Sequence, residues 1–329
     1  MAGRELDLAD LGQRLTGAGI EEIRPLTGGA SGLTYAATMT TADRRPVVIK
    51  VAPPGVAPVL NRDVLRQSRL LRVLGPTPVP VPEVLWEDAG HPPEVPPLFV
   101  MSYVGGVSFE PLFDPDDGAS DAHVAVVARR MASAARVLAA LHALEPDALG
   151  LAGEPRVGMD EEIDRWARLL QTVDPALAPG WDDVASALRA SVPPSPVDAI
   201  VHGDFRLGNL LAVGADIEAV VDWEIWSIGD PRVDLGWFLV NADPATYRRS
   251  TRYAGALPSA RELDDLYADA LGRHVPDVGW FEALACFKST ATWALIVKHN
   301  RRRTVPDPAH EEMAGTLPHL LERARTLLG

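Results

Sequence analysis

The sequence predicts an α+β protein with two lobes, a small antiparallel-sheet lobe followed by a larger, mainly helical lobe. Three observations support this class. Residues 34–40 and 47–51 have strand-like patterns on either side of a polar turn. Residues 122–144 repeat apolar side chains every three or four positions, which is typical of a core helix. A proline-rich stretch over residues 78–97 separates the two patterns, and 329 residues with 47% apolar composition suffice for two lobes with a real core.

The first lobe is predicted to open with strands around a Gly-rich turn at residues 28–32. The hairpin of residues 34–51 follows, and apolar positions recur at helical spacing over residues 60–74, where Gly75 and Pro76 end the helix. Residues 98–104 are expected to form another strand. The boundary is placed there, so that residues 1–104 form the N-lobe and residues 105–329 the C-lobe.

The second lobe is predicted to be helical with one small hairpin. After the helix of residues 122–144, residues 160–190 have a helical pattern with interruptions, and the prolines of residues 193–196 end it. Short strands near residues 210–213 and 219–221 flank a turn at residues 214–216. The chain after residue 234 is mostly helical in pattern. Strands with one helix, a connector and a helical half make the layout of a protein-kinase-like fold.

Composition narrows the classes of function. Lys and Arg number 31 against 45 Asp and Glu, a net charge of −14 that disfavours binding to nucleic acid or to anionic membranes. The one cysteine, Cys286, cannot form an internal disulfide, as expected in a reducing compartment. No signal-peptide pattern opens the chain, and no stretch reaches 18 apolar residues. We therefore expect a cytoplasmic protein without a membrane segment, and assign no oligomeric state from the sequence.

A catalytic segment is predicted over residues 202–209. Phosphoryl transfer needs a carboxylate near the attacking hydroxyl and oxygen ligands for magnesium on the phosphates. Asp204 and Asn209 have the Asp-x-x-x-x-Asn spacing of a catalytic loop, in which the Asp accepts the substrate proton and the Asn binds metal. Asp222 supplies the second metal ligand, because a short hairpin would fold it back towards Asn209. Taken alone, His202-Gly-Asp could equally be a turn with a helix cap.

With their neighbours, these residues resemble the aminoglycoside phosphotransferase and choline-kinase-like family. The branch most similar is the kinase-like domain found before some acyl-CoA dehydrogenases. The resemblance rests on six stretches, which together bracket about two thirds of the chain: residues 26–35, 48–50, 99–106, 141–142, 202–209 and 221–237.

The resemblance implies roles for further residues. Lys50 is expected to contact the α- and β-phosphates of ATP, or of another nucleoside triphosphate, and Asp234 to brace the catalytic loop. The Gly-rich turn and the strand before the boundary are expected to bind the nucleotide, through Gly28, Gly29, Ser31, Gly32, Met101, Ser102 and Tyr103. Supporting roles are expected for His202, Arg206, Gln67 and Glu224.

Two positions depart from the family pattern, and one of them, Gln67, bears on how Lys50 is held; the other is Gly32, where an Asn is common. Relatives usually carry an acid on the N-lobe helix that pairs with the strand lysine, whereas this chain has Gln67. Asp63, one turn earlier, could replace that acid. The departure also motivates an alternative, in which the chain is a nucleotide-binding pseudokinase acting as a regulatory or partner module.

The predicted function is ATP- and magnesium-dependent transfer of a phosphoryl group to a hydroxyl of a small molecule. Protein kinase activity is disfavoured, because Trp-Glu follows Asp222 where a protein kinase has Phe-Gly. The acceptor classes left open are an aminoglycoside-like antibiotic, an amino-alcohol and a hydroxyacyl metabolite. The acidic composition of the chain favours an amine-bearing acceptor. The resemblance to the kinase-like domain found before acyl-CoA dehydrogenases favours a hydroxyacyl acceptor.

Overall fold

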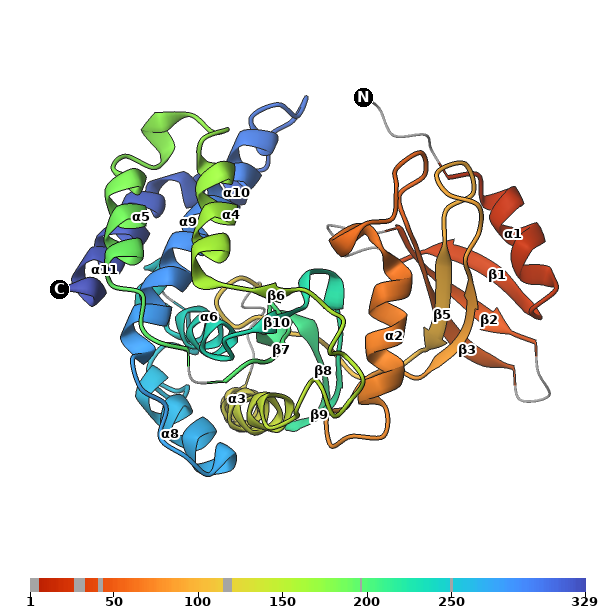
Figure 1. Cartoon of the computed structure of the whole chain (residues 1–329), viewed down its shortest axis with the longest axis horizontal. Helices are drawn as coiled ribbons and strands as arrows, with labels where there is room; N and C mark the ends of the chain where they lie inside the picture. Colours follow the sequence, from red (N-terminus) through yellow and green to blue (C-terminus); the bar gives the residue numbers. More distant parts are fainter. Residues whose placement is uncertain (1–5, 27–32, 41–43, 115–119, 196, 249–250) are drawn as a thin grey trace. The chain divides into compact units, whose positions relative to one another are not determined.

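A computed structural model describes residues 6–26, 33–40, 44–114, 120–195, 197–248 and 251–329. The chain forms two compact units (Figure 1). The first unit holds Met1–Val107 together with Glu218–Trp226, and the second holds Ser108–Ile217 together with Ser227–Gly329. An antiparallel sheet dominates the first unit and helices dominate the second, so the predicted α+β class is confirmed. The two units are described separately below.

The first unit is built on a five-stranded antiparallel sheet in the order β1-β2-β3-β5-β4. After α1 (Leu8–Thr16), its strands are β1 (Ile20–Pro25), β2 (Leu33–Met39), β3 (Arg45–Val51), β4 (Val84–Asp88) and β5 (Leu98–Ser102). Alternate side chains of a strand face opposite sides of a sheet. Val47, Ile49 and Val51 of β3 therefore share a core with Leu11 and Leu15 of α1. Lys50 lies on the other face.

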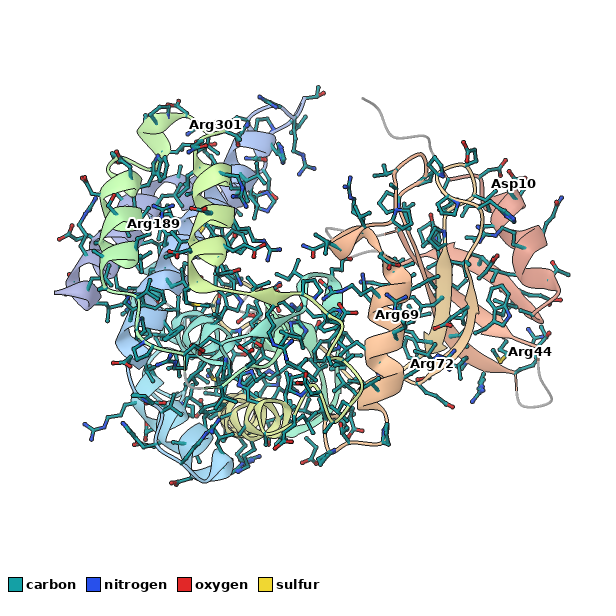
Figure 2. All side chains as sticks on the ribbon, in the orientation of Figure 1. Asp10, Arg44, Arg69, Arg72, Arg189 and Arg301 are labelled. Carbon is teal, nitrogen blue, oxygen red and sulfur yellow. The ribbon has the colours of Figure 1, made fainter. Side chains whose placement is uncertain are left out.

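The helix α2 (Val64–Leu74) packs against β4 and β5. The predicted helix over residues 60–74 is divided, because a 3-10 turn, η1 (Leu60–Arg62), precedes it. Asp63 separates the two by capping α2, and its Oδ1 accepts a hydrogen bond of 3.0 Å from the Leu65 N–H. Figure 2 shows Arg69 and Arg72 on this helix, and Arg72 pairs with Glu87 of β4 at 3.2 Å.

The second unit begins with α3 (Asp121–His142), which confirms the helix predicted over residues 122–144. The helical region predicted over residues 160–190 consists of α4 (Met159–Leu170), the 3-10 turn η2 (Pro175–Leu177) and α5 (Trp181–Ala190). A three-stranded sheet joins β6 (Arg156–Val157), β10 (Ser227–Gly229) and β7 (Ala199–Val201) in that order. The predicted hairpin is also present as β8 (Leu210–Val213) and β9 (Asp216–Val220), and the boundary between the units falls within β9.

The core of the second unit surrounds α9 (Val278–Asn300), which packs against α4, α5, α6 (Arg232–Ala242) and α11 (Leu317–Leu328). Every residue of α6 is buried, and its polar residues Arg232, Asp234 and Asn241 are hydrogen-bonded within the protein. The other described helices of this unit are α7 (Pro244–Tyr247), α8 (Ala260–Leu271) and α10 (Pro308–Glu312), and its other 3-10 turns are η3 (Leu207–Asn209) and η5 (Met313–Gly315). The 3-10 turn η4 (Trp223–Ile225) belongs to the first unit. Within the described ranges, none of the helices combines the length and apolarity needed to cross a membrane.

We predict that Gly236→Ala destabilises the second unit. A Cβ at this position of α6 would lie 2.4 Å from the Phe281 carbonyl oxygen of α9, so the two helices would have to separate. Overpacking of this kind costs about 1–3 kcal/mol in the free energy of unfolding, measurable by urea denaturation. Gly279→Ala in α9 is the control, because its Cβ meets no atom within 4 Å. The alanine at position 279 should be neutral or stabilise by up to about 1 kcal/mol. Equal stability of the two variants would contradict the prediction.

Candidate active site

The predicted catalytic residues of the second unit gather around a turn that follows β7. Asp234, at the start of α6, is fully buried and accepts hydrogen bonds from the His202 N–H at 2.5 Å and the Gly203 N–H at 2.8 Å. Gly203 has a φ of 85°, a backbone conformation that other residues adopt only with strain. Asp234 therefore holds the backbone immediately before Asp204 through these two bonds.

Asp234 is held in turn by His142 of α3. The His142 Nε2 lies 3.4 Å from Asp234 Oδ2, and its Nδ1 lies 2.7 Å from the Tyr267 hydroxyl. A carboxylate only accepts, so Nε2 is the donor in the contact with Asp234. Burial alone would raise the pKa of Asp234, but the hydrogen bond and charge of His142, the charge of His202 and the backbone N–H of His202 together lower it.

Asp204 is fixed by nitrogen donors on both oxygens of its carboxylate. Oδ1 accepts from Trp237 Nε1 at 2.8 Å and lies 3.4 Å from Arg206 Nε. Oδ2 accepts from Asn209 Nδ2 at 2.8 Å. The Asp204 side chain stays 25% exposed, so a held carboxylate remains accessible to a ligand.

Asn209 closes this catalytic segment. Its Nδ2 donates to the Asp204 carbonyl oxygen as well as to the carboxylate, both at 2.8 Å. Because the amide nitrogen is engaged in this way, Oδ1 is the atom of Asn209 that can meet a cation. The η3 turn of residues 207–209 places the side chain, and spacing alone predicted its proximity to Asp204.

Lys288 of α9 lies beneath the same turn and was not predicted from the sequence. It is 4% exposed, donates to the Gly203 carbonyl oxygen, and its Nζ lies 3.9 Å from the centre of the Trp237 ring. Burial lowers the pKa of Lys288, and the charge of Asp204 acts in the opposite direction. A single lysine within the apolar central part of a helix was the available signal.

Glu110 is a second residue that the sequence did not indicate. Its Oε2 accepts from Arg206 Nη1 at 3.2 Å and from the Gly208 N–H at 3.0 Å, so it holds the middle of the catalytic segment. Burial raises the pKa of Glu110 to about 7, in spite of the nearby Arg206 charge. Arg206 thereby bridges Glu110 and Asp204.

In the first unit, Lys50 pairs with two carboxylates. Its Nζ lies 3.0 Å from Asp222 Oδ1 and 3.0 Å from Glu224 Oε1. Although burial acts to lower the pKa of Lys50, these two charges raise it. The Asp222 side chain is 38% exposed and its φ is 66°, which turns the chain into η4.

Neither helix residue considered from the sequence provides this pairing. Asp63 caps α2 and pairs with Arg69 at 3.4 Å. Gln67 is buried and lines a small cavity with Lys50 and Met101. The carboxylates beside Lys50 come instead from η4 and the residue before it.

The structure describes three of the seven further residues that the resemblance assigns to nucleotide binding. Ser102 ends β5, and its N–H donates to the Glu83 carbonyl oxygen at 2.8 Å. The Tyr103 N–H lies 3.4 Å from the Pro46 carbonyl oxygen, and Tyr103 is 49% exposed. The role of Met101, Ser102 and Tyr103 in binding adenine stays a prediction. The remaining four, Gly28, Gly29, Ser31 and Gly32, lie outside the described residues.

A two-lobed fold of this kind, with the predicted Asp-Asn segment in one unit and a lysine paired with two carboxylates in the other, is typical of a small-molecule kinase. The family model described as "Phosphotransferase enzyme family" matches residues 22–270, well over half of the sequence. The chain belongs to this family.

This chain aligns with part of the length of its curated relatives. Acyl-CoA dehydrogenase family member 10 of Mus musculus is 26% identical over 223 residues, which cover 66% of this chain and 20% of the relative. Acyl-CoA dehydrogenase family member 11 of Homo sapiens is 26% identical over 298 residues, which cover 85% of this chain and 37% of the relative. The chain thus spans between a fifth and two fifths of the length of these relatives.

Solved structures share the fold. A protein from Ralstonia eutropha assigned to the aminoglycoside phosphotransferases has a TM-score of 0.76 and 21% identity, with 98% of each chain covered. The aminoglycoside phosphotransferase APH(4)-Ia, solved in a ternary complex with ADP and hygromycin B, has a TM-score of 0.61 and 14% identity, with 95% of this chain and 98% of that chain covered. These similarities confirm the predicted kinase-like fold.

We predict that Glu110→Gln removes a pH dependence of stability. The pKa of Glu110 is about 7 in the folded chain and 4.5 ordinarily, so the folded state binds more protons between these values. The stabilising contribution is therefore present below about pH 4.5 and is lost as the pH rises through about 7. The difference in the free energy of unfolding between the variant and the parent should change by roughly 2–3 kcal/mol across this window, measured by urea denaturation.

The control for this measurement is Glu161→Gln, which removes a carboxylate at an exposed position of α4. Its stability should follow the pH profile of the parent. A Glu110→Gln profile parallel to the parent would show that Glu110 does not titrate in this range.

Proposed function

We propose that the chain is an ATP- and magnesium-dependent O-phosphotransferase that phosphorylates a hydroxyl of a small molecule. The observation that carries the proposal is the held but accessible carboxylate of Asp204, with donors on both oxygens and a braced turn behind it. Phosphoryl transfer depends mostly on positioning and charge neutralisation, and a fixed carboxylate next to a metal-binding amide suits that need.

Asp204 has the role of orienting the acceptor. Its carboxylate accepts a hydrogen bond from the acceptor hydroxyl and points the oxygen at the terminal phosphorus of the nucleotide. As the new oxygen–phosphorus bond forms and the bond to the leaving diphosphate breaks, the hydroxyl proton passes to Asp204. Trp237 and Asn209 keep the carboxylate from rotating during this step.

The nucleotide is proposed to meet Lys50, Asp222 and Asn209. Carboxylate and amide oxygens are the donors that magnesium prefers, and both the Asp222 carboxylate and the Asn209 Oδ1 are of this type. Magnesium held by them would offset charge on the phosphates. Lys50 adds a positive charge that its two carboxylate neighbours preserve. The ADP in the complex of APH(4)-Ia supports a nucleotide as the donor.

The acceptor is proposed to belong to one of three classes. Hygromycin B in the APH(4)-Ia complex supports a hydroxyl-bearing antibiotic. The acyl-CoA dehydrogenase names of the curated relatives support a hydroxyacyl metabolite. An amino-alcohol agrees with the net charge of −14. We propose a cytoplasmic setting for the reaction, in keeping with the single cysteine.

The pairing of Lys50 argues against the pseudokinase alternative. That alternative was motivated by Gln67, which lacks the charge to pair with the lysine. Lys50 has two carboxylate partners from another part of the chain, so the neutral helix residue does not leave it without a counter-ion. We therefore favour turnover over binding alone.

We predict that Asp204→Asn lowers the rate of phosphoryl transfer by about 10²–10⁴-fold, because the amide cannot accept the proton. Binding of ATP should change little, since Asp204 faces the acceptor. Magnesium-dependent ADP release is the measurement, with a panel of aminoglycosides, amino-alcohols and hydroxyacyl-CoA compounds as acceptors. Asp265→Asn, at an exposed position of α8, is the matched control. Unchanged turnover in Asp204→Asn would remove Asp204 from the mechanism.

We predict that Asp222→Asn raises the magnesium concentration needed for half-maximal activity. Loss of residues that only support metal ligands weakens metal affinity by about 10–100-fold, so loss of a ligand should cost at least about tenfold. A magnesium titration of ADP release at saturating ATP gives the value. A titration curve that coincides with the parent would exclude Asp222 as a metal ligand.

A further inference from the structure

One of the two carboxylates that pair with Lys50 is also the proposed metal ligand Asp222. Lys50 Nζ lies 3.0 Å from both Asp222 Oδ1 and Glu224 Oε1, and the lysine side chain is only 12% exposed. Under the proposed function, Asp222 also binds a divalent cation. The cation and the ammonium then compete for the negative charge of one carboxylate, which weakens the pairing between Asp222 and Lys50.

We propose that Glu224 is the positioning residue that keeps Lys50 oriented towards the phosphates while Asp222 is engaged by metal. This assignment rests on the proposed function. Glu224 has the charge that α2 lacks at Gln67, and it reaches Lys50 from η4. Its side chain is 18% exposed against 38% for Asp222, so water competes less for the Glu224 carboxylate.

The backbone on both sides of Glu224 is fixed. On the N-terminal side, Trp223 Nε1 donates to the Val220 carbonyl oxygen at 2.9 Å. On the C-terminal side, Arg66 Nη1 donates to the Trp226 carbonyl oxygen at 3.0 Å. A short turn tied at both ends presents Glu224 in one place, as a positioning group requires.

Arg66 also links α2 to this turn through a second contact. Its guanidinium carbon lies 3.8 Å from the centre of the Trp226 ring, and Arg66 and Trp226 are both buried. The helix therefore acts on Lys50 through Arg66, Trp226 and Glu224, in place of a direct ion pair from the helix. Gln67 lies in the next position of α2 and lines the same cavity as Lys50. A carboxylate introduced at position 67 would therefore face the cavity that holds the Lys50 ammonium.

The test measures nucleotide binding and turnover in four proteins: the parent, Glu224→Gln, Gln67→Glu and the double variant. We expect Glu224→Gln to weaken binding of ATP with magnesium by about tenfold, because a partly buried ion pair is broken. The double variant should regain most of that loss. Gln67→Glu alone should bind ATP within about threefold of the parent, since Lys50 is already paired.

Glu87→Gln is the matched control, because it removes a carboxylate from the same unit that pairs with Arg72 instead of Lys50. It should bind ATP as the parent does. Thermal melting of each variant establishes that the chain is folded. A merely structural role for Glu224 would lower the melting temperature without rescue of binding by Gln67→Glu.

The outcomes separate this proposal from the function on which it rests. Glu224→Gln with parental ATP binding would overturn the role of Glu224, and so would weakened binding that Gln67→Glu does not restore. Either result leaves the proposed function intact if the parent releases ADP with an acceptor from the panel. A parent that binds ATP but releases no ADP with any acceptor would contradict the proposed function instead, and direct binding would still report on Glu224.

Discussion

The buried carboxylate of Asp234 accepts two consecutive backbone N–H groups, and the path of the chain into Asp204 depends on that interaction. A charge without exposure to water must be satisfied by donors, and here the donors are the turn before Asp204 and His142 of α3. Because His142 is bonded in turn to Tyr267 of α8, helices distant in sequence are positioned by one group. Lys288 of α9 adds a bond to the carbonyl side of the same turn. The predicted catalytic segment is thus held from several directions, while the Asp204 side chain stays 25% exposed.

Much of the fold could be predicted, because its longer elements have clear periodicity. The alternation of β3 and the repeat in α3 follow directly from which side chains are buried. The division between η1 and α2 was missed, since the apolar spacing continues across Asp63 and only its capping bond reveals the break. The very short strands β6 and β10 have too few residues to show a period. That residues 218–226 belong to the first unit depends on tertiary packing, which no local pattern reports.

Some residues of the candidate site could be predicted from local sequence patterns, and others could not. Asp204, Asn209 and Asp222 could be chosen from spacing, because their roles depend on separations along the chain. Glu110 lies far in sequence from the turn that it contacts and has no local signature. A lone lysine in an apolar stretch marks Lys288 as unusual, but it does not indicate which turn the lysine contacts. The partners of Lys50 were sought on α2, where a helix neighbour is the simplest source of an acid. The chain instead uses Glu224, which is 174 positions away from the lysine.

The first unit is made of two separate stretches of sequence, and this limits how the protein can be truncated or recombined. The chain passes between the units at residues 107 and 108, at 217 and 218, and again at 226 and 227. A polypeptide truncated after Val107 would keep Lys50 and lose both of its counter-ions, together with the segment that Arg66 holds. Lys50 and its two carboxylate partners therefore cannot be moved into another protein as one continuous segment. Genetic shuffling of this unit would have to preserve two separate stretches at once, which ties its evolution to that of the catalytic turn lying between them in sequence.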